Sequence, residues 1–159
     1  MSTAPIVERL WDYGWLCHDT VQLTAAASDL ELVQQYVASP AFHISFLPNY
    51  KDETGIHGPF KAGRISADDY IPLHEADFES YLTSIEFSDT PGADVAERAK
   101  LLPHLRSALA GGRRCYVLRR DERDTELFHD WGYILWVFRE FLFAAPQRDG
   151  LERFVIGYD

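Results

Sequence analysis

The sequence has 159 residues, with 25 acidic and 15 basic side chains, a formal net charge of -10 and a pI near 4.9. Hydrophobic residues make up 47% and aromatic residues 14% of it, which excludes a disordered acidic segment, because such segments are poor in both. The acidic balance also argues against direct binding of nucleic acid or of an anionic membrane, since phosphate groups require an excess of lysine and arginine.

Hydrophobic periodicity, caps and turn residues divide the chain into short helices and strands. In the first part we expect a helix over 3–11, a strand over 15–23, a helix over 28–39, a strand over 42–46, a long loop over 49–63 and a helix over 76–82. In the second part we expect a connector over 88–92, a helix over 95–109, a strand over 115–119, a turn over 121–124, and strands over 133–143 and 151–158.

The helix over 28–39 has the clearest local signal. Ser28, followed three residues later by Glu31, is typical of a capping box, in which each side chain bonds the other's backbone N–H. Pro40 ends this helix because it can neither donate a hydrogen bond nor continue the helical backbone.

The apolar run at 133–143 fits a buried helix or a strand equally well by its periodicity. We expect a strand, because aromatic and β-branched residues dominate the run. The turn residues of 146–150 then lead into the strand at 151–158, so the two strands form a hairpin. The expected fold is one α+β domain over residues 1–159, an antiparallel sheet with a strand-rich C-terminal hairpin and helices packed on one face.

The two cysteines, Cys17 and Cys115, lie far apart and form no CxxC pair, which excludes a disulfide scaffold and a zinc ribbon. Two buried, reduced thiols are expected, and a single bridge between them stays open. The first fifteen residues lack the pattern of a signal peptide, and the apolar stretch 131–145 is interrupted by Arg139 and Glu140 and too short to span a bilayer. We therefore expect a cytoplasmic protein.

Motifs of known chemistry are missing from the sequence. It has no GxSxG, GxGxxG or P-loop pattern, and its six histidines stand in no HxH, HxxxH or HExxH relation, so no cofactor, metal or catalytic residue is predicted. Cys17, His18 and Asp19 are the residue types of a thiol triad, but neighbours in a strand point to opposite faces, and Cys17 is interpreted as a core residue.

Charge is distributed unevenly along the chain. Residues 1–92 contain 14 acidic and 4 basic side chains, whereas residues 93–159 contain 11 of each. Between Arg64 and Arg98 there are nine carboxylates and no lysine or arginine. A surface of this kind attracts basic partners and raises their association rate. The arginines at 113, 114, 119, 120 and 123 stand beside acidic residues and favour cross-strand ion pairs over a phosphate groove.

The leading hypothesis is a non-catalytic protein whose acidic surface occludes a basic protein partner, such as a nuclease. Acidic cytoplasmic domains of this size without catalytic motifs are similar to the immunity proteins that neutralise bacterial toxins, a likeness of class and composition. The residues expected to contact the partner are Asp68, Asp69, Tyr70, Glu75, Asp77, Glu79, Tyr81 and Glu86.

The alternative hypothesis is a small enzyme or ligand-binding domain with an aromatic-lined pocket. Its proton-transfer groups would be His43, His57 and His129, provided that at least two of them meet in an apolar cleft. Two aromatic clusters, at 11–15 and 131–136, would line the pocket, although the same residues also suit a core.

Overall fold

The computed structural model describes residues 6–9, 14–44, 46, 54–85, 93–120, 124–130 and 137–158. Within these ranges six strands form one antiparallel sheet, in the order β1-β2-β8-β7-β6-β5. They are β1 (Ile6–Arg9), β2 (Gly14–Gln22), β5 (Tyr70–Leu73), β6 (Arg114–Leu118), β7 (Val137–Ala144) and β8 (Gly150–Tyr158). A separate ribbon pairs β3 (Ile56–His57) with β4 (Phe60–Lys61).

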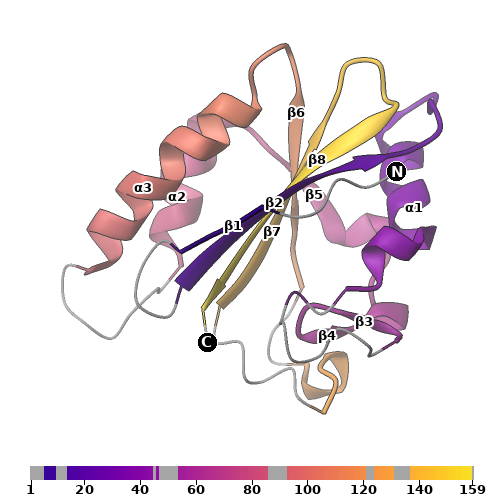
Figure 1. Ribbon diagram of the computed structural model, residues 1–159, viewed down its shortest axis with the longest axis horizontal. Coiled ribbons are helices and arrows are strands. Elements are labelled where there is room, and N and C mark those ends of the chain that lie inside the picture. The colour runs from indigo at the N-terminus through magenta and orange to yellow at the C-terminus, as the bar shows by residue number, and fades with distance from the viewer. Residues whose placement is uncertain are drawn as a thin grey trace.

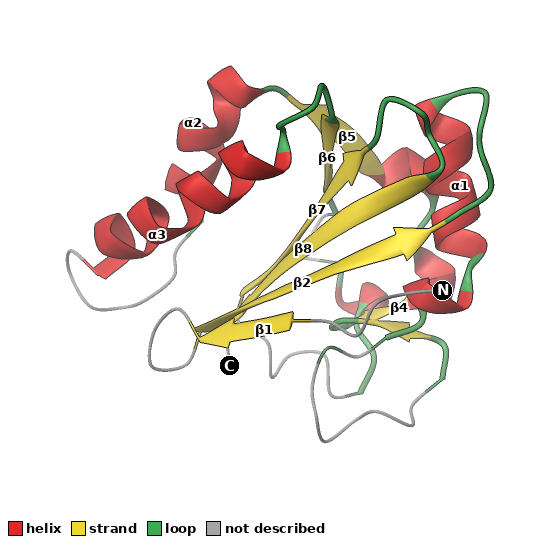
Figure 2. Ribbon diagram, turned by 45° about the horizontal axis from the view of Figure 1, so that its top comes forward, coloured by secondary structure: helices red, strands yellow, loops and turns green. Residues whose placement is uncertain are grey.

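Helices cover both faces of the sheet. Figure 1 shows α1 (Asp29–Ala38) on one side of the strands and α2 (Phe78–Thr83) and α3 (Ala93–Ala108) on the other. Figure 2 shows β2, β8 and β7 twisting between these two groups of helices. The antiparallel α+β architecture is as expected, but the expectation that the helices pack on one face is wrong.

The central strands explain why both faces are covered. Phe141 and Leu142 are neighbours on β7, point to opposite faces and are both fully buried. Phe141 belongs to the core beneath α2 and α3, and Leu142 belongs to the core beneath α1. A strand that is apolar on both sides must be covered on both sides, because either exposed face would leave a large apolar surface in water.

The N-terminus of α1 is fixed by a cap and by an ion-pair cluster. The Ser28 hydroxyl accepts a hydrogen bond from the Glu31 amide at 3.1 Å, while the Glu31 carboxylate accepts from Ala27 rather than from Ser28, at 2.7 Å. Asp29 bonds the guanidinium groups of Arg114 and Arg148, and these bonds, chiefly that from Arg114, hold the pKa of Asp29 well below its usual range. The cluster ties α1 to β6 and to the β7–β8 turn.

The structure confirms most of the expected elements that it describes. The strands at 15–23, 115–119 and 151–158, the described part of 133–143, and the helices at 28–39, 76–82 and 95–109 are all present within a few residues. The loop expected at 49–63 contains the β3–β4 ribbon. The connector at 88–92 lies outside the described residues, as do most of the turn at 121–124 and the start of the apolar run.

Two predicted elements are wrong. Residues 6–9 form a strand rather than part of a helix, because β1 pairs with β2, with Val7 opposite Cys17. The strand expected at 42–46 is absent from its described residues, where a 3-10 helix (Pro40–Phe42) ends in irregular backbone. The carbonyl of Phe42 bonds the side chain of His57 at 2.7 Å instead of a neighbouring strand. No helix among the described residues is both long and apolar enough to cross a membrane.

We expect Ser28→Ala to lower the free energy of unfolding by about 1 kcal/mol, because the first turn of α1 loses its side-chain cap. Urea unfolding followed by circular dichroism measures the change. Ser107→Ala, at an exposed position within α3, is the matched control and should change stability by less than about 0.5 kcal/mol. Equal losses in both variants would contradict the capping role.

Candidate functional site

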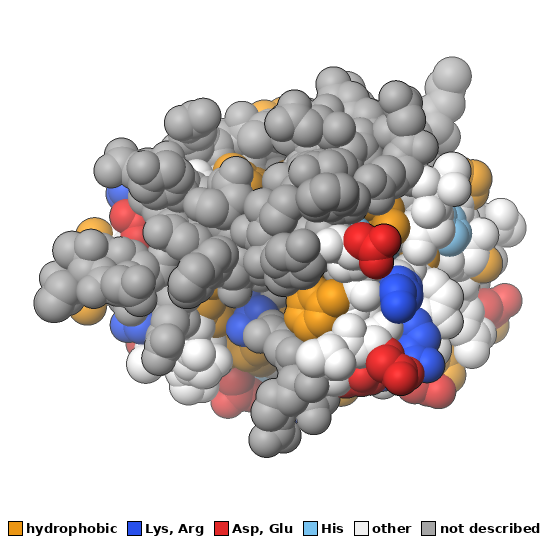
Figure 3. All heavy atoms as spheres, turned by 90° about the horizontal axis from the view of Figure 1, so that it is seen from below, with side chains coloured by type: hydrophobic (Ala, Val, Ile, Leu, Met, Phe, Trp, Pro, Cys, Tyr) orange, Lys and Arg blue, Asp and Glu red, His pale blue; other side chains and the backbone are white. Residues whose placement is uncertain are grey.

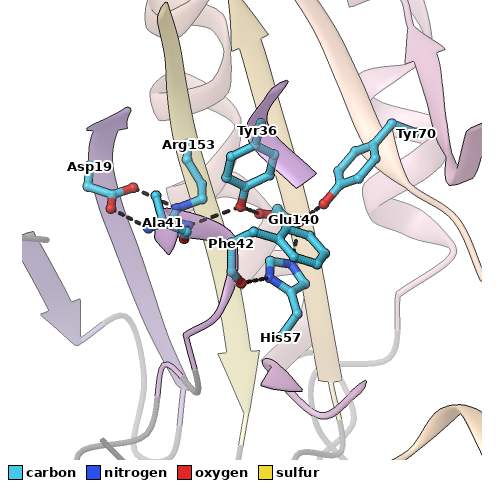
Figure 4. A network of polar contacts seen from close by, with 8 residues as sticks. All are labelled: Asp19, Tyr36, Ala41, Phe42, His57, Tyr70, Glu140 and Arg153. Carbon is cyan, nitrogen blue, oxygen red and sulfur yellow. Dashed lines mark hydrogen bonds and ion pairs between the residues drawn. The ribbon is translucent and has the colours of Figure 1, made fainter. Parts of the chain in front are cut away.

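The most densely bonded group of side chains in the described structure lies between the sheet and α1. This buried polar network consists of Asp19, Tyr36, His57, Tyr70, Glu140 and Arg153, together with the backbone carbonyls of Ala41 and Phe42 (Figure 4). Its residues come from β2, α1, β3, β5, β7 and β8, so the network joins both ends of the chain.

Glu140 of β7 is the centre of the network. Its carboxylate accepts hydrogen bonds from the hydroxyl groups of Tyr36 and Tyr70, each at 2.5 Å, and from Nε2 of His57 at 2.8 Å. Burial alone would raise the pKa of Glu140, but the charge and hydrogen bond of His57, with further contributions from Arg153 and Tyr36, lower it. Glu140 is therefore an ionised carboxylate at zero solvent exposure.

His57 contacts an acceptor with each ring nitrogen. Nδ1 donates to the Phe42 carbonyl at 2.7 Å and Nε2 donates to the Glu140 carboxylate at 2.8 Å. Two such acceptors require two N–H groups, so the ring is an imidazolium paired with Glu140. The ring also stacks on Phe42, with centroids 3.9 Å apart and planes 7° from parallel, an arrangement that favours a cation over an aromatic face.

Arg153 of β8 forms the second ion pair. Nε donates to Asp19 at 2.8 Å and Nη2 donates to the other oxygen of the same carboxylate. Nη1 donates to the Ala41 carbonyl at 2.7 Å and to the Tyr36 hydroxyl at 3.0 Å. Tyr36 thus accepts from Arg153 and donates to Glu140, which connects the two ion pairs through one hydroxyl group.

Burial, followed by the charge of Glu140, raises the pKa of both Tyr36 and Tyr70 well above the usual range, so both hydroxyls stay protonated donors. Two carboxylates face two cations, so the buried charges balance. Tyr36, His57, Glu140 and Arg153 are each at most 1% exposed. A substrate cannot reach these groups in this conformation. The arrangement is suited to holding α1 and the strands together rather than to acid–base catalysis.

The predicted acidic surface is divided by β5 into two groups. Asp68 and Asp69 precede the strand in a 3-10 helix that contacts α1. Asp68 is exposed, whereas Asp69 accepts a hydrogen bond from Arg120 at 3.0 Å. Tyr70 cannot serve as an exposed anchor, because it is 6% exposed and its hydroxyl belongs to the buried polar network.

The second acidic group follows β5, at the start of α2. Glu75, Asp77 and Glu79 are exposed there, and Arg106 of α3 lies 3.0 Å from Glu79 and 3.9 Å from Glu75. Tyr81 is half-buried with its ring edge-to-face on Phe141, 5.6 Å between centroids. Glu86 lies outside the described residues. The fold therefore places Arg106 beside Glu75 and Glu79, which have no basic residue near them in the sequence.

The three histidines of the alternative hypothesis lie in one region but form no accessible dyad. His57 is fully buried, His43 is exposed, and Nε2 of His129 lies 3.0 Å from the carbonyl of Gly58. No group of three histidine, cysteine or carboxylate side chains suited to a metal ion occurs among the residues that the structure describes.

The Cys17-His18-Asp19 sequence is split between the two faces of β2, as strand geometry requires. Cys17 and Asp19 lie on the α1 face, while His18 stacks on Phe154 of the opposite core, 4.2 Å between ring centroids. Burial, with a smaller effect of Asp19, raises the pKa of Cys17 to about 11, which removes its reactivity as a thiolate at neutral pH. Cys115 belongs to the opposite core, and both cysteines are free.

The sequence analysis did not identify the buried polar network, although the sequence carries a signal of it. Asp19, Glu140 and Arg153 are charged residues within strands whose neighbours are largely apolar. A charged residue at a core-facing position of such a strand must find a partner, because an unpaired buried charge is prohibitively unfavourable. Which charges pair depends on the order of strands in the sheet, which the sequence does not display.

No protein-family model matches the chain, and no curated protein sequence matches it. Among solved structures, a crystal structure of citrus MAF1 is similar, with a TM-score of 0.49 and 12% sequence identity over 92% of this chain and 89% of that chain. This degree of similarity does not assign the chain to a family or bear on its function.

We expect Glu140→Gln to lower the free energy of unfolding by about 3–5 kcal/mol, because it removes the negative charge that pairs with a buried cation and replaces one of the two acceptor oxygens with an NH2 group. Glu152→Gln, on the neighbouring strand β8, is the matched control, since that carboxylate contacts the partly exposed His18 and Arg113. The control should lose less than about 1 kcal/mol in the same urea titration. A similar small loss in both variants would contradict the central role of Glu140.

The same variant should also change the pH dependence of stability. As the pH falls below about 4.5, the ordinary pKa of glutamate, the unfolded chain takes up this proton before the folded protein does. The stability contributed by Glu140 is thus present above that pH and lost below it. From about pH 5 to pH 3, the free energy of unfolding should fall less steeply in Glu140→Gln than in the wild type. Parallel curves would show that Glu140 is not ionised in the folded protein.

Proposed function

We propose that this chain is a non-catalytic binding protein that occludes a basic protein partner, in the manner of an immunity protein or antitoxin acting on a bacterial toxin such as a nuclease. The proposed contact surface is the acidic group at the start of α2, formed by Glu75, Asp77 and Glu79. Asp68 lies at the other end of β5 and would contact the partner only at the margin of this surface.

The observation that carries the proposal is the charge imbalance of this exposed turn. Three carboxylates occur within five residues, and among the described residues only Arg106 forms ion pairs with them. Exposed pairs of this kind contribute little to stability, so they leave Glu75 and Glu79 available to a partner. Asp77 has no ion pair with any residue in the described ranges. A cluster of solvated carboxylates steers a cationic partner and sets its orientation.

The inaccessibility of His57 and Glu140 supports a binding role over the enzymatic alternative. These two residues would be the natural acid–base pair, but both are fully buried and bonded to each other, to a carbonyl and to two tyrosines. Catalysis through them would require opening of the core.

Charge reversal tests the proposal on a partner captured from the native host and then purified. We expect Asp77→Lys/Glu79→Lys to slow association with the basic partner at least about tenfold at low salt, and to weaken the salt dependence of binding. Surface plasmon resonance at two salt concentrations measures both effects.

The matched control is Asp130→Lys/Glu126→Lys, which makes the same change in net charge at two exposed positions elsewhere. This control should bind nearly as well as the wild type. If both double variants slow association equally, net charge rather than the α2 surface governs binding. If neither has an effect, the proposed interface is wrong.

A further inference from the structure

A groove of about 620 Å³ lies at the end of the sheet where β6 ends and β7 begins. One wall is formed by α2 and the residue before it, and the floor is formed by β5, β6 and β7. Figure 3 shows one face of the molecule, on which described basic side chains lie beside hydrophobic ones. A concavity of this volume is in the range that accommodates small molecules.

The floor of the groove is apolar. Ile71 of β5 is directly opposite Val117 of β6, and both pack on the α2 face of the sheet. Val117 is fully buried, so the half-buried Ile71 is the member of this pair that faces the groove. Leu73 and Tyr81 extend this apolar surface toward α2. A ligand with a hydrocarbon or aromatic body would therefore gain affinity by removing the floor from water.

Three arginines line the groove where β6 ends and β7 begins, namely Arg119, Arg120 and Arg139. Val117 pairs with Phe141, and both belong to the core on the α2 face. Side chains alternate along a strand, so Arg119 and Arg139, two residues further along, lie on this same face at the same end of the two strands.

Arg119 is an exposed cation of the groove without an ion pair to any of the residues that the structure describes. Its amide donates to the carbonyl of Asp69 at 2.8 Å, which fixes its backbone, but its side chain is exposed and forms no ion pair with any residue in the described ranges. Arg120 is held by Asp69 at 3.0 Å, and its buried Nε has no hydrogen-bond partner in the described structure. The predicted pairing of these arginines with acidic residues therefore holds for Arg120, through Asp69, while Arg119 forms no such pair within the described ranges.

The two serine hydroxyls of the groove are already engaged as donors. The hydroxyl of Ser80 donates to the backbone carbonyl of Asp77 at 3.0 Å. The hydroxyl of Ser84 donates to the backbone carbonyl of Tyr81 at 2.6 Å. Asp77 is the only carboxylate among the lining residues that the structure describes. It repels an anion from the α2 end of the groove and so favours the arginine end.

We propose that this groove binds a small molecule that has an apolar body and an anionic head, either a carboxylate or a phosphate ester. The head would lie against Arg119, whose guanidinium fork matches both kinds of anion, and the body would lie on the half-buried side chains of Ile71, Leu73 and Tyr81. The inference goes beyond the proposed binding of a basic protein and does not depend on it.

Titration with phenyl phosphate, benzoate and benzyl alcohol, followed by amide chemical shifts, tests the proposal. We expect at least one of the two anions to bind saturably, with shifts at Ser80, Ser84 and Val117, and neutral benzyl alcohol to bind at least about tenfold more weakly. Tighter binding of phenyl phosphate would identify a phosphate ester as the natural head group. Tighter binding of benzoate would identify a carboxylate.

Variants at the two ends of β6 provide the matched comparison. Arg119→Ala should weaken anion binding at least about tenfold, whereas Arg113→Ala, at the opposite end of the strand, should leave it unchanged. Asp77→Asn should strengthen it severalfold, because the repelling carboxylate is gone. Each variant is first shown to unfold in urea as the wild type does.

Three results would overturn the proposal: no saturable binding of either anion, equal binding of benzyl alcohol, or equal losses in Arg119→Ala and Arg113→Ala. None of them bears on the proposed protein partner, since that interface is tested by charge reversal at Asp77 and Glu79. Loss of partner binding with retained anion binding, or the reverse, separates the two proposals.

Discussion

The buried ion pair between Glu140 and His57 is the constraint on which this fold depends. An ionised carboxylate in the middle strand of a sheet is tolerated only if donors surround it, and here the donors come from α1, β3 and β5. Each donor fixes the position of the element that carries it. The network therefore specifies one arrangement of segments that apolar packing alone would hold less uniquely.

This constraint also explains the irregular backbone after α1. The segment from Pro40 to Phe42 supplies two carbonyls to the network, one to Arg153 and one to His57. These two carbonyls point to buried side chains instead of to a neighbouring strand, and the segment forms a 3-10 helix and not the strand that its alternating pattern predicts. The β3–β4 ribbon then places His57 over Phe42 and closes this side of the core.

The two faces of the sheet consequently have different roles. The α1 face holds the charged network, which is sealed from solvent and joins distant parts of the chain. The α2 face holds an apolar core whose margin carries the exposed carboxylates of α2 and the arginines beside the groove. Both functional proposals concern this second face, because charged side chains there remain accessible after folding.

The sequence by itself determined the local structure: the cap of α1 at Ser28, the strands on either side of the 146–150 turn and the separation of Cys17 from His18. These features depend on residues a few positions apart, and local geometry is enough to predict them. The partners of the charges were decided only by the tertiary structure. Acidic residues of the first half form ion pairs with arginines of the second half: Asp19 with Arg153, Asp29 with Arg114 and Glu79 with Arg106. Strand order and helix packing bring these pairs together, even though Asp19 and Arg153 are 134 residues apart in the sequence. A charge map drawn along the chain therefore overestimates the acidity of the folded surface.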